Sequence, residues 1–394
     1  MKKIGYYIAN FPKLSETFIS REVLLLKNLD QDVNVFASKK PDLDEQNLLG
    51  LELETLINQT YYIDSKRAIG SLLKNILLFF KYYPLAKKLS SEATNKPNPY
   101  VLLGRAIILS KSCQKNKIEH LHAHWPYATM VVYLAHKISG IPYSISIHAH
   151  EMFHENGHFK RTLADIKFSA FCNKAAMQVV LEKYPQLKEK CHLIYHGVSL
   201  NNFPFLKMPE LDDTIRIVTA GRLTKTKGFD RLIRACSEVK KSGIKIKLSI
   251  LGIGDLKNEL IELANDLDFS NDLDMPGWVN REQVRDYMSK SHLFTLLADV
   301  NYHDGLPNVA LEAMAVGRPV IISPLPAAKE AVLQDVNGFV LSKKDAFKEF
   351  ETLIQRIVSK DIDINSMGTN ARKTIEDKFA DNVYINHMVK LLNE

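Results

Sequence analysis

The feature that most constrains the fold is a regular alternation of short apolar segments and amphipathic segments through the C-terminal half. This alternation predicts strands at 215–220, 247–251, 273–276, 293–297 and 320–323. The helices between them are predicted over 229–241, 256–267, 281–289 and 307–316. Continuous apolar strands separated by helices are typical of parallel βαβ units buried on both faces. We therefore expect a doubly wound α/β domain.

The N-terminal half has the same pattern with less regular spacing. We expect strands at 3–9, 32–38, 118–123 and 143–149, helices over about 15–29 and 127–139, and two short strands at 178–181 and 192–195. At 394 residues the chain is too long for one typical core, and the proline-containing segment 197–209 is the expected linker. Two such domains bind a ligand in a cleft, beyond the carboxyl ends of their strands.

The composition is that of an ordinary globular protein, with 46% hydrophobic and 25% charged residues. No apolar run approaches the roughly 18 residues that a bilayer span needs, and Asn10 and Pro12 interrupt the first apolar stretch, so we expect neither a transmembrane helix nor a secretory signal. The four cysteines are Cys113, Cys172, Cys191 and Cys236. They lack paired Cys-x-x-Cys spacing, which indicates reduced residues of a cytoplasmic protein.

The net charge of +7 is concentrated in residues 66–117, where eleven Lys and Arg residues accompany a single acid, Glu92. Apolar and aromatic residues lie among these cations between Leu72 and Tyr83. This combination favours contact with an anionic membrane surface. The alternative is a pair of core helices with solvated basic sides. Nucleic-acid binding is not expected, because no nucleic-acid motif accompanies the charge.

One short segment, residues 303–315, combines two acids with the start of a helix. Asp304 and Glu312 lie eight positions apart, Gly305 permits an unusual turn, and Pro307 suits the first helical position. The free amides of residues 306–309 would face a docked anion. A turn before an amphipathic helix is also an ordinary structural feature, but this combination suits a sugar nucleotide, with acids for its hydroxyls and amides for its phosphates.

A second polar loop follows the strand at 215–220. Glycines at 221 and 228 bracket the cations of this loop, among which Arg222 can bind a diphosphate bidentately and Lys227 acts as a point charge. Another loop, Gly252-Ile253-Gly254, resembles part of a dinucleotide fingerprint but lacks its third glycine. A tight strand-to-helix turn explains this loop better than a nicotinamide site does.

Histidines cluster at two predicted strand ends in the N-terminal half. His120, His122 and His124 alternate along one strand, and His148 and His150 follow another, so each set shares one face. No acid-rich spacing accompanies them, so a metal site is not favoured. We expect His148 in the catalytic cleft. For His124 and His150, loop anchoring and substrate contact remain open.

Taken together, these motifs resemble glycosyltransferase family 4, the retaining nucleotide-sugar transferases of the GT-B fold, and within it bacterial exopolysaccharide transferases of the colanic-acid type. The resemblance rests on residues 11–18, 120–124, 140–151, 221–228, 277–279, 304–315 and 337–339. It implies two doubly wound Rossmann-like domains facing a central cleft, an acceptor-side domain at 1–199, a nucleotide-sugar domain at 200–376, and a C-terminal helix within 377–394 that crosses back to the first domain.

The resemblance also implies roles for individual residues. Arg222 and Lys227 would hold the donor diphosphate, Gly277 and Trp278 the base, and Glu312 the ribose. The turn of Asp304, Gly305, Leu306, Pro307 and Asn308 would hold the transferred sugar, with His148 beside the reacting carbon. The acceptor side would include Phe11, Ser15, His124 and His150. The family usually has Glu where this chain has Asp304, which shifts that carboxylate by about one bond length at a site where about 0.5 Å matters.

The leading hypothesis is therefore a retaining glycosyltransferase without metal or cofactor. It would move a sugar from a nucleotide diphosphate sugar, UDP-linked rather than GDP-linked, to a glycan or lipid-linked acceptor in surface polysaccharide synthesis. The expected location is the cytoplasm, with peripheral contact to the inner membrane face through residues 66–117. The alternatives are a catalytically inactive nucleotide-sugar-binding or assembly protein and, from the Rossmann-like halves and the loop at 252–254, an NAD-dependent dehydrogenase.

Overall fold

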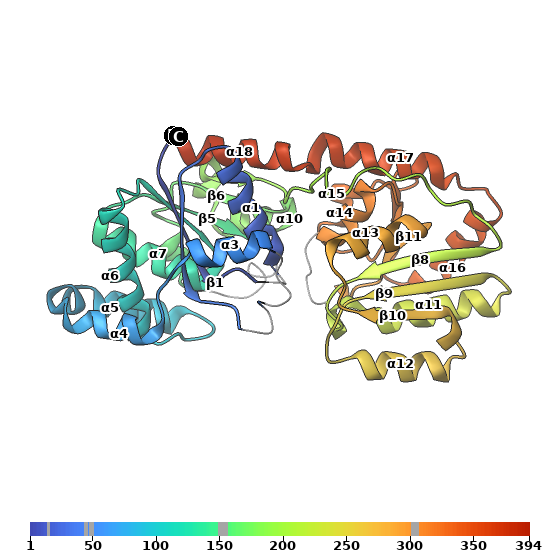
Figure 1. Cartoon of the computed structure of the whole chain (residues 1–394), viewed down its shortest axis with the longest axis horizontal. Coiled ribbons are helices and arrows are strands. Elements are labelled where there is room, and N and C mark those ends of the chain that lie inside the picture. Colours follow the sequence, from blue (N-terminus) through green and yellow to red (C-terminus); the bar gives the residue numbers. More distant parts are fainter. Residues whose placement is uncertain (14–15, 43–45, 47–50, 149–156, 301–306) are drawn as a thin grey trace. The chain divides into compact units, whose positions relative to one another are not determined.

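The structure is a computed structural model of the full chain, and it describes every residue except 14–15, 43–45, 47–50, 149–156 and 301–306 (Figure 1). The chain forms two compact units. The first consists of Met1–Tyr195 together with Tyr384–Glu394, and the second of His196–Val383. Both are parallel α/β units, so the predicted fold class is confirmed. Among the described helices, none combines the length and apolar character that a membrane-spanning helix needs.

The first unit is built on a seven-stranded parallel sheet with the order β3-β2-β1-β4-β5-β6-β7. Its strands are β1 (Ile4–Asn10), β2 (Val33–Lys39), β3 (Tyr61–Tyr62), β4 (His120–His124), β5 (Tyr143–Ile147), β6 (Ser169–Phe171) and β7 (Cys191–Leu193). The strand order reverses between β1 and β4. In open α/β sheets the crevice outside the carboxyl ends of such strands is the usual ligand position.

Helices cover both faces of this sheet. They are α1 (Thr17–Asn28), α3 (Leu51–Gln59), α4 (Ser65–Leu73), α5 (Ile76–Glu92), α6 (Pro99–Lys115), α7 (Pro126–Ser139), α9 (Phe159–Thr162), α10 (Lys174–Lys183) and α18 (Asp381–Asn393), with a 3₁₀ turn at Pro185–Lys190. The strand predicted at 178–181 is wrong, because these residues lie in α10. Asn173 caps that helix by accepting the Ala176 N–H at 2.7 Å, and the neighbouring strand is β6.

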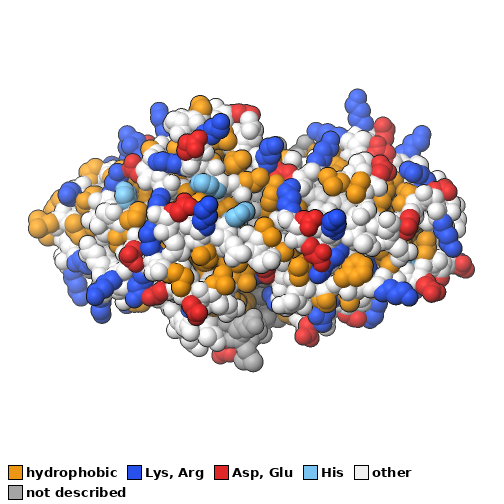
Figure 2. Space-filling view, turned by 90° about the horizontal axis from the view of Figure 1, so that it is seen from above, with side chains coloured by type: hydrophobic (Ala, Val, Ile, Leu, Met, Phe, Trp, Pro, Cys, Tyr) orange, Lys and Arg blue, Asp and Glu red, His pale blue; other side chains and the backbone are white. Residues whose placement is uncertain are grey.

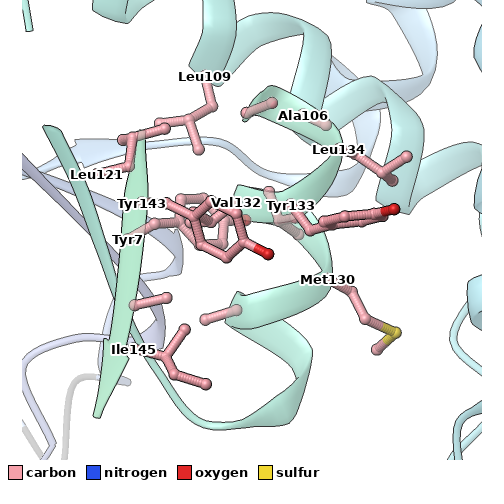
Figure 3. Close-up of a cluster of buried hydrophobic side chains, with 14 of the residues drawn as sticks. Tyr7, Ala106, Leu109, Leu121, Met130, Val132, Tyr133, Leu134, Tyr143 and Ile145 are labelled. Carbon is pink, nitrogen blue, oxygen red and sulfur yellow. The ribbon is translucent and has the colours of Figure 1, made fainter. Parts of the chain in front are cut away.

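Two apolar cores flank the sheet because side chains along a strand alternate between its faces. Tyr7 belongs to the core formed with α6 and α7. Figure 3 shows part of it, where sheet residues meet side chains from those helices: Leu121, Tyr143 and Ile145 with Ala106, Leu109, Met130, Val132, Tyr133 and Leu134. Tyr6, next to Tyr7 in the chain, belongs to the other core, which includes residues of α1 and α18.

The second unit has a six-stranded parallel sheet with the order β10-β9-β8-β11-β12-β13. Its strands are β8 (Thr214–Ala220), β9 (Lys245–Leu251), β10 (Leu273–Gly277), β11 (Leu293–Leu296), β12 (Val320–Ile322) and β13 (Gly338–Val340). Its order reverses between β8 and β11, so the loops after these two strands lie at the position where such sheets bind ligands.

The first four helices of the second unit follow the predicted alternation, and the later ones were not predicted. The helices are α11 (Phe229–Lys241), α12 (Lys257–Asp266), α13 (Arg281–Lys290), α14 (Asn308–Ala315), α15 (Ala328–Ala331), α16 (Ala346–Val358) and α17 (Ile364–Thr374), with 3₁₀ turns at Lys225–Lys227 and Ser270–Asp272 and a π turn at Ile375–Phe379. The helix predicted over 307–316 is one residue shorter at each end. Pro307 is its N-cap, with extended backbone angles of φ −69° and ψ 121°, and not its first helical residue.

Candidate functional site

In the second unit, the loop that follows β8 presents the two predicted phosphate ligands. Leu223 anchors this loop: its side chain is buried, and its N–H donates to the Ile253 carbonyl at 2.9 Å. Arg222 on one side of the anchor is exposed, and Lys227 is half-buried. The loop thus holds two cationic side chains on a backbone that is fixed to the neighbouring loop.

The Gly252-Ile253-Gly254 loop after β9 has a packing role that explains its glycines. A Cβ on Gly252 would lie 2.0 Å from the Gly221 carbonyl oxygen, and one on Gly254 would lie 2.5 Å from the Leu223 carbonyl oxygen. Both glycines also have positive φ angles, 142° and 159°. These glycines therefore let the β9 loop press against the β8 loop, as expected for a tight turn.

The predicted base-binding residues lie at the carboxyl end of β10, next to these loops. The Gly277 carbonyl accepts the Gly252 N–H at 2.8 Å, and Trp278 is 38% exposed. A capping box then begins α13, in which the Asn280 and Gln283 side chains each accept the other's backbone N–H at 2.9 Å. Trp278 is thus an accessible aromatic side chain on a backbone held from both sides.

The loop after β11 meets the loop after β8. The Asp299 N–H donates to the Thr226 carbonyl at 3.0 Å. Beyond it, Pro307 is the N-cap of α14 and Asn308 its first residue, both half-buried, and Glu312 on the same helix is half-buried as well. The predicted residues Asp304, Gly305 and Leu306 lie outside the described residues.

A buried arginine fixes the far end of α14. Arg318 is 0% exposed, and its guanidinium donates to backbone carbonyls from three segments, those of Met288, Val316 and Leu206 among them, at 2.8–3.3 Å. Burial lowers the pKa of this guanidinium to about 10. Buried charge is tolerated only when it is fully hydrogen-bonded, so Arg318 ties α14 to α13 and to the segment before β8.

In the first unit, two of the clustered histidines are held by serines on the neighbouring strand. His120 Nε2 lies 2.7 Å from the Ser144 hydroxyl, and His122 lies 2.7 Å from Ser144 and 3.0 Å from Ser146 through its two ring nitrogens. Burial lowers the pKa of His120 to about 3, with Lys167 and Lys2 contributing, and burial also lowers the pKa of His122 well below its usual value. Both rings are neutral parts of the sheet interior at pH 7.

His124 and His148 form a separate pair at the ends of β4 and β5. His124 Nδ1 lies 3.3 Å from His148 Nε2. His148 is 5% exposed, and its ring lies beside those of Trp125 and Phe18, with centroid distances of 4.4 and 4.9 Å. The structure therefore brings these two predicted site residues together.

The remaining acceptor-side predictions have different outcomes. Phe11 is 1% exposed and lies in the apolar core with α1 and α18, so its side chain packs inward. Its backbone carbonyl accepts a hydrogen bond from the Tyr62 hydroxyl at 3.0 Å. Ser15 and His150 lie outside the described residues.

One polar group near this site was not predicted from the sequence. Glu22 on α1 is 1% exposed and accepts hydrogen bonds from the hydroxyls of Tyr6 and Tyr384. The signal was present, since Glu22 occupies the buried stripe of α1 between Ile19 and Leu26, where an acid is unexpected.

Comparison with known proteins agrees with this geometry. Residues 206–374 match the family model described as glycosyl transferases group 1. Among curated proteins, the chain is similar to the putative colanic acid biosynthesis glycosyltransferase WcaL of Escherichia coli, with 23% identity and 99% of both chains covered. It is also similar to the amylovoran biosynthesis glycosyltransferase AmsK of Erwinia amylovora, with 26% identity over 52% of this chain and 51% of that protein. A third relative is the capsular polysaccharide biosynthesis glycosyltransferase CapM of Staphylococcus aureus, with 24% identity over 94% and 92%.

Solved structures share the whole architecture. Anabaena HepE in complex with UDP superposes with a TM-score of 0.75 at 15% identity, over 100% of both chains. A glycosyltransferase from Rickettsia africae superposes with a TM-score of 0.74 at 16% identity, over 100% of this chain and 98% of that one. The chain thus has the GT-B fold, and its residues 206–374 match the model of group 1 glycosyltransferases.

Proposed function

We propose that this protein is a retaining, metal-independent glycosyltransferase of family 4, which moves a sugar from a UDP-sugar to a lipid-linked glycan in surface polysaccharide synthesis. The observation that carries the proposal is the loop after β8, which places Arg222 and Lys227 at the point where the strand order of the second unit reverses. The names of the relatives, which refer to amylovoran, colanic acid and capsular polysaccharide, support the biological setting. HepE, which has the same fold, was solved with UDP.

The donor diphosphate has a set of matched contacts in this proposal. Arg222 and Lys227 supply positive charge, and the N-terminus of α14 adds backbone amides and the helix dipole. Trp278 offers an aromatic face for the base, and Glu312 offers a carboxylate for the ribose hydroxyls. Asp304, Gly305 and Leu306 complete the sugar side.

The proposed chemistry needs charge stabilisation more than an enzyme nucleophile. The bond between sugar C1 and the diphosphate oxygen breaks, the acceptor hydroxyl oxygen bonds to C1 from the same face, and its proton passes to the departing diphosphate. Negative charge therefore grows on the diphosphate, where Arg222, Lys227 and the α14 amides stabilise it. His148 contacts the donor sugar and orients it.

Because the proposed acceptor is lipid-linked, we propose a membrane-binding role for the basic stretch at residues 66–117. Helices α4 and α5 carry large apolar side chains that point to solvent: Leu73 is 82%, Leu77 83% and Phe80 69% exposed. Exposed lysines surround them at positions 74, 81, 87 and 88. Figure 2 shows hydrophobic and Lys/Arg side chains interspersed over this end of the first unit. We propose that this surface contacts anionic lipid at the inner membrane face.

Ligand binding and turnover together test the function. Thermal unfolding is measured with UDP, GDP and NAD(H), and transfer is measured from UDP-sugars with excess EDTA present. We expect stabilisation by UDP and turnover that survives EDTA. Stabilisation by NAD(H) alone would favour the dehydrogenase alternative. UDP binding without turnover on any acceptor tried would favour the inactive binding protein.

A further inference from the structure

A buried carboxylate connects the candidate residue His148 to the last helix of the chain. Glu22 accepts the Tyr6 hydroxyl with one oxygen and the Tyr384 hydroxyl with the other. The first of these oxygens also lies 3.5 Å from His124 Nε2. Because His124 Nδ1 is 3.3 Å from His148 Nε2, the sequence of contacts runs from Tyr384 through Glu22 and His124 to His148.

Glu22 is held in its ionised form in spite of its burial. Burial alone would raise the pKa of this carboxyl, but the contact with His124 and the hydrogen bond from the Tyr384 hydroxyl lower it to about 2 overall. An ionised carboxylate accepts hydrogen bonds and donates none. Each neighbour of Glu22 must therefore direct a proton toward it, and the two tyrosines do so.

The same requirement fixes the proton on His124. Its Nε2 lies 3.5 Å from the Glu22 carboxylate, whose negative charge favours the hydrogen on Nε2, and in the neutral ring Nδ1 is then an acceptor. An acceptor at His124 Nδ1 requires a donor at His148 Nε2. His148 therefore carries its own proton on Nε2, and its Nδ1 is the ring atom with hydrogen-bond-accepting character.

Glu22, His122 and His124 are also of metal-ligating types, and their ligand atoms lie within 4.8 Å of one another. Hydrogen bonding accounts for them better. Both oxygens of Glu22 accept tyrosine hydroxyls, and both ring nitrogens of His122 are bonded to serines.

We propose that Glu22 and His124 are positioning residues that set the tautomer and orientation of His148, and that Tyr6 and Tyr384 hold Glu22 in place for this purpose. The proposal deepens the proposed function and rests on it, because it assumes that His148 receives a hydroxyl of the donor sugar. A hydroxyl donates to a ring nitrogen only if that nitrogen is unprotonated. Fixing the proton of His148 on Nε2 makes Nδ1 the receiving atom.

The tautomers are measured directly by NMR of the full chain with ¹⁵N-labelled histidine, with His124→Asn and His148→Asn variants used to assign the signals. We expect both His124 and His148 to be protonated at Nε2 in the wild-type protein. The Glu22→Gln variant keeps the shape but offers an N–H to His124, so both rings should move their protons to Nδ1. A wild-type His148 protonated at Nδ1, or one unaffected by Glu22→Gln in a folded variant, would overturn the proposal.

A pair of tyrosine variants provides the matched control. Tyr384→Phe removes one hydrogen bond to Glu22 and should shift the His148 signals. Tyr7→Phe removes an equally buried hydroxyl, which is bonded to Ser38 on the neighbouring strand, and should leave them unchanged. Equal shifts in both variants would mean that general loosening of the unit, and not Glu22, controls His148.

Activity separates this proposal from the function on which it rests. Glu22→Gln should lower kcat/KM for sugar transfer at least tenfold while leaving the affinity for UDP unchanged. If the tautomers change but transfer does not, the positioning of His148 stands and its proposed contact with the donor sugar fails. If transfer falls while the tautomers stay the same, the positioning proposal fails.

Discussion

At the residue scale, Lys227 and Lys225 are neighbours on one loop with different expected roles. Lys227 is half-buried at the end of the loop after β8, whereas Lys225 is exposed and lines a groove with residues of α11 and α12, including Arg234 and Glu259. Of these two lysines, only Lys227 is proposed to reach the diphosphate. The two residues therefore form a natural pair for separating a specific phosphate contact from general positive charge.

Lys227→Ala should remove a hydrogen bond to a charged group, which contributes about 1.5–3 kcal/mol. This corresponds to a loss of roughly 10- to 150-fold in kcat/KM for the donor. Steady-state kinetics with a UDP-sugar measure it, and Lys225→Ala is the control, expected to change kcat/KM by less than about threefold. Equal donor turnover by the two variants would remove the phosphate assignment of Lys227.

The buried neutral histidines predict an acid-sensitive first unit. The pKa of His120 is about 3 in the folded state, mainly because of burial, and lies near 6.5 when unfolded. Its contribution to stability is therefore present above about pH 6.5 and is lost as the pH falls toward 3, because the unfolded chain binds the proton first. Glu22 acts in the same direction, between about 4.5 and about 2.

Urea unfolding at pH 7.5 and pH 5.5 measures this loss. Each buried neutral histidine should cost about 1.4 kcal/mol per pH unit below 6.5. His120→Gln retains a polar group toward Ser144 but does not titrate, so the decrease in unfolding free energy between the two pH values should be smaller by about that amount. The same decrease in the variant and the wild type would show that His120 does not carry the effect.

Residue roles were predicted from the sequence wherever one local segment sufficed. Arg222 and Lys227 were proposed because their loop follows a predicted strand, where this architecture places its ligands, and Trp278 was proposed from the family resemblance. Glu22 was missed because its role depends on partners at positions 6, 124 and 384, which only the folded chain brings together. Periodicity identifies a buried position, but it does not reveal the partner of a buried charge.

At the element scale, the second sheet was predicted more completely than the first. Its strands are apolar runs bounded by helices, and this sequence pattern is typical of parallel strands buried on both faces. In the first unit, the segment 178–181 contains two adjacent valines, which favour a strand. The structure makes it helical, because Asn173 caps α10 and because β6, at Ser169–Phe171, already fills the sheet position.

For the basic stretch at residues 66–117, the sequence left open a membrane-contacting surface or a pair of core helices. Helices α4 and α5 have features of both. One face packs inward through Leu72, Ala86 and Leu89, as core helices do. The other presents Leu73, Leu77 and Phe80 to solvent. Fully burying one such side chain is favourable by about 1.5–3 kcal/mol, and each basic residue near an anionic surface adds about 1 kcal/mol.

The protein should therefore sediment with vesicles that contain anionic lipid at low salt. Substituting Lys74, Lys81, Lys87 and Lys88 by Glu should release it, and substituting Leu73, Leu77 and Phe80 by Ser should weaken binding even at low salt. Four exposed lysines of the second unit, Lys257, Lys343, Lys344 and Lys348, changed to Glu are the control. Release by the control set to the same extent would show a non-specific effect of net charge.

At the scale of the whole molecule, the first unit is completed by the end of the chain. The core with α1 contains five side chains from α18: Tyr384, Ile385, Met388, Leu391 and Leu392. At about 1.5–3 kcal/mol for each buried side chain, their sum is comparable with the roughly 5–15 kcal/mol by which whole domains are stable. The first unit should not be stable without them.

Adjacent residues of α18 test this dependence. Met388→Asp places a charge at a position that is 0% exposed and should abolish or strongly lower the thermal unfolding transition of the first unit. His387→Asp changes an exposed neighbour and should have an effect within about 0.5 kcal/mol. Differential scanning calorimetry of the full chain measures both, and a similar transition in the two variants would contradict the role of α18.

Because residues from Tyr384 onward belong to the first unit, this unit can complete its fold only late in protein synthesis. The first unit is nearly complete at Tyr195, yet its final residues begin at Tyr384. At about 5–20 residues per second, a ribosome spends about 10–40 s making the intervening segment. Throughout that interval the nascent first unit exposes an apolar face and lacks the tyrosine that holds Glu22. The first unit is therefore begun before the second and finished after it, and during translation it is a candidate client for chaperones.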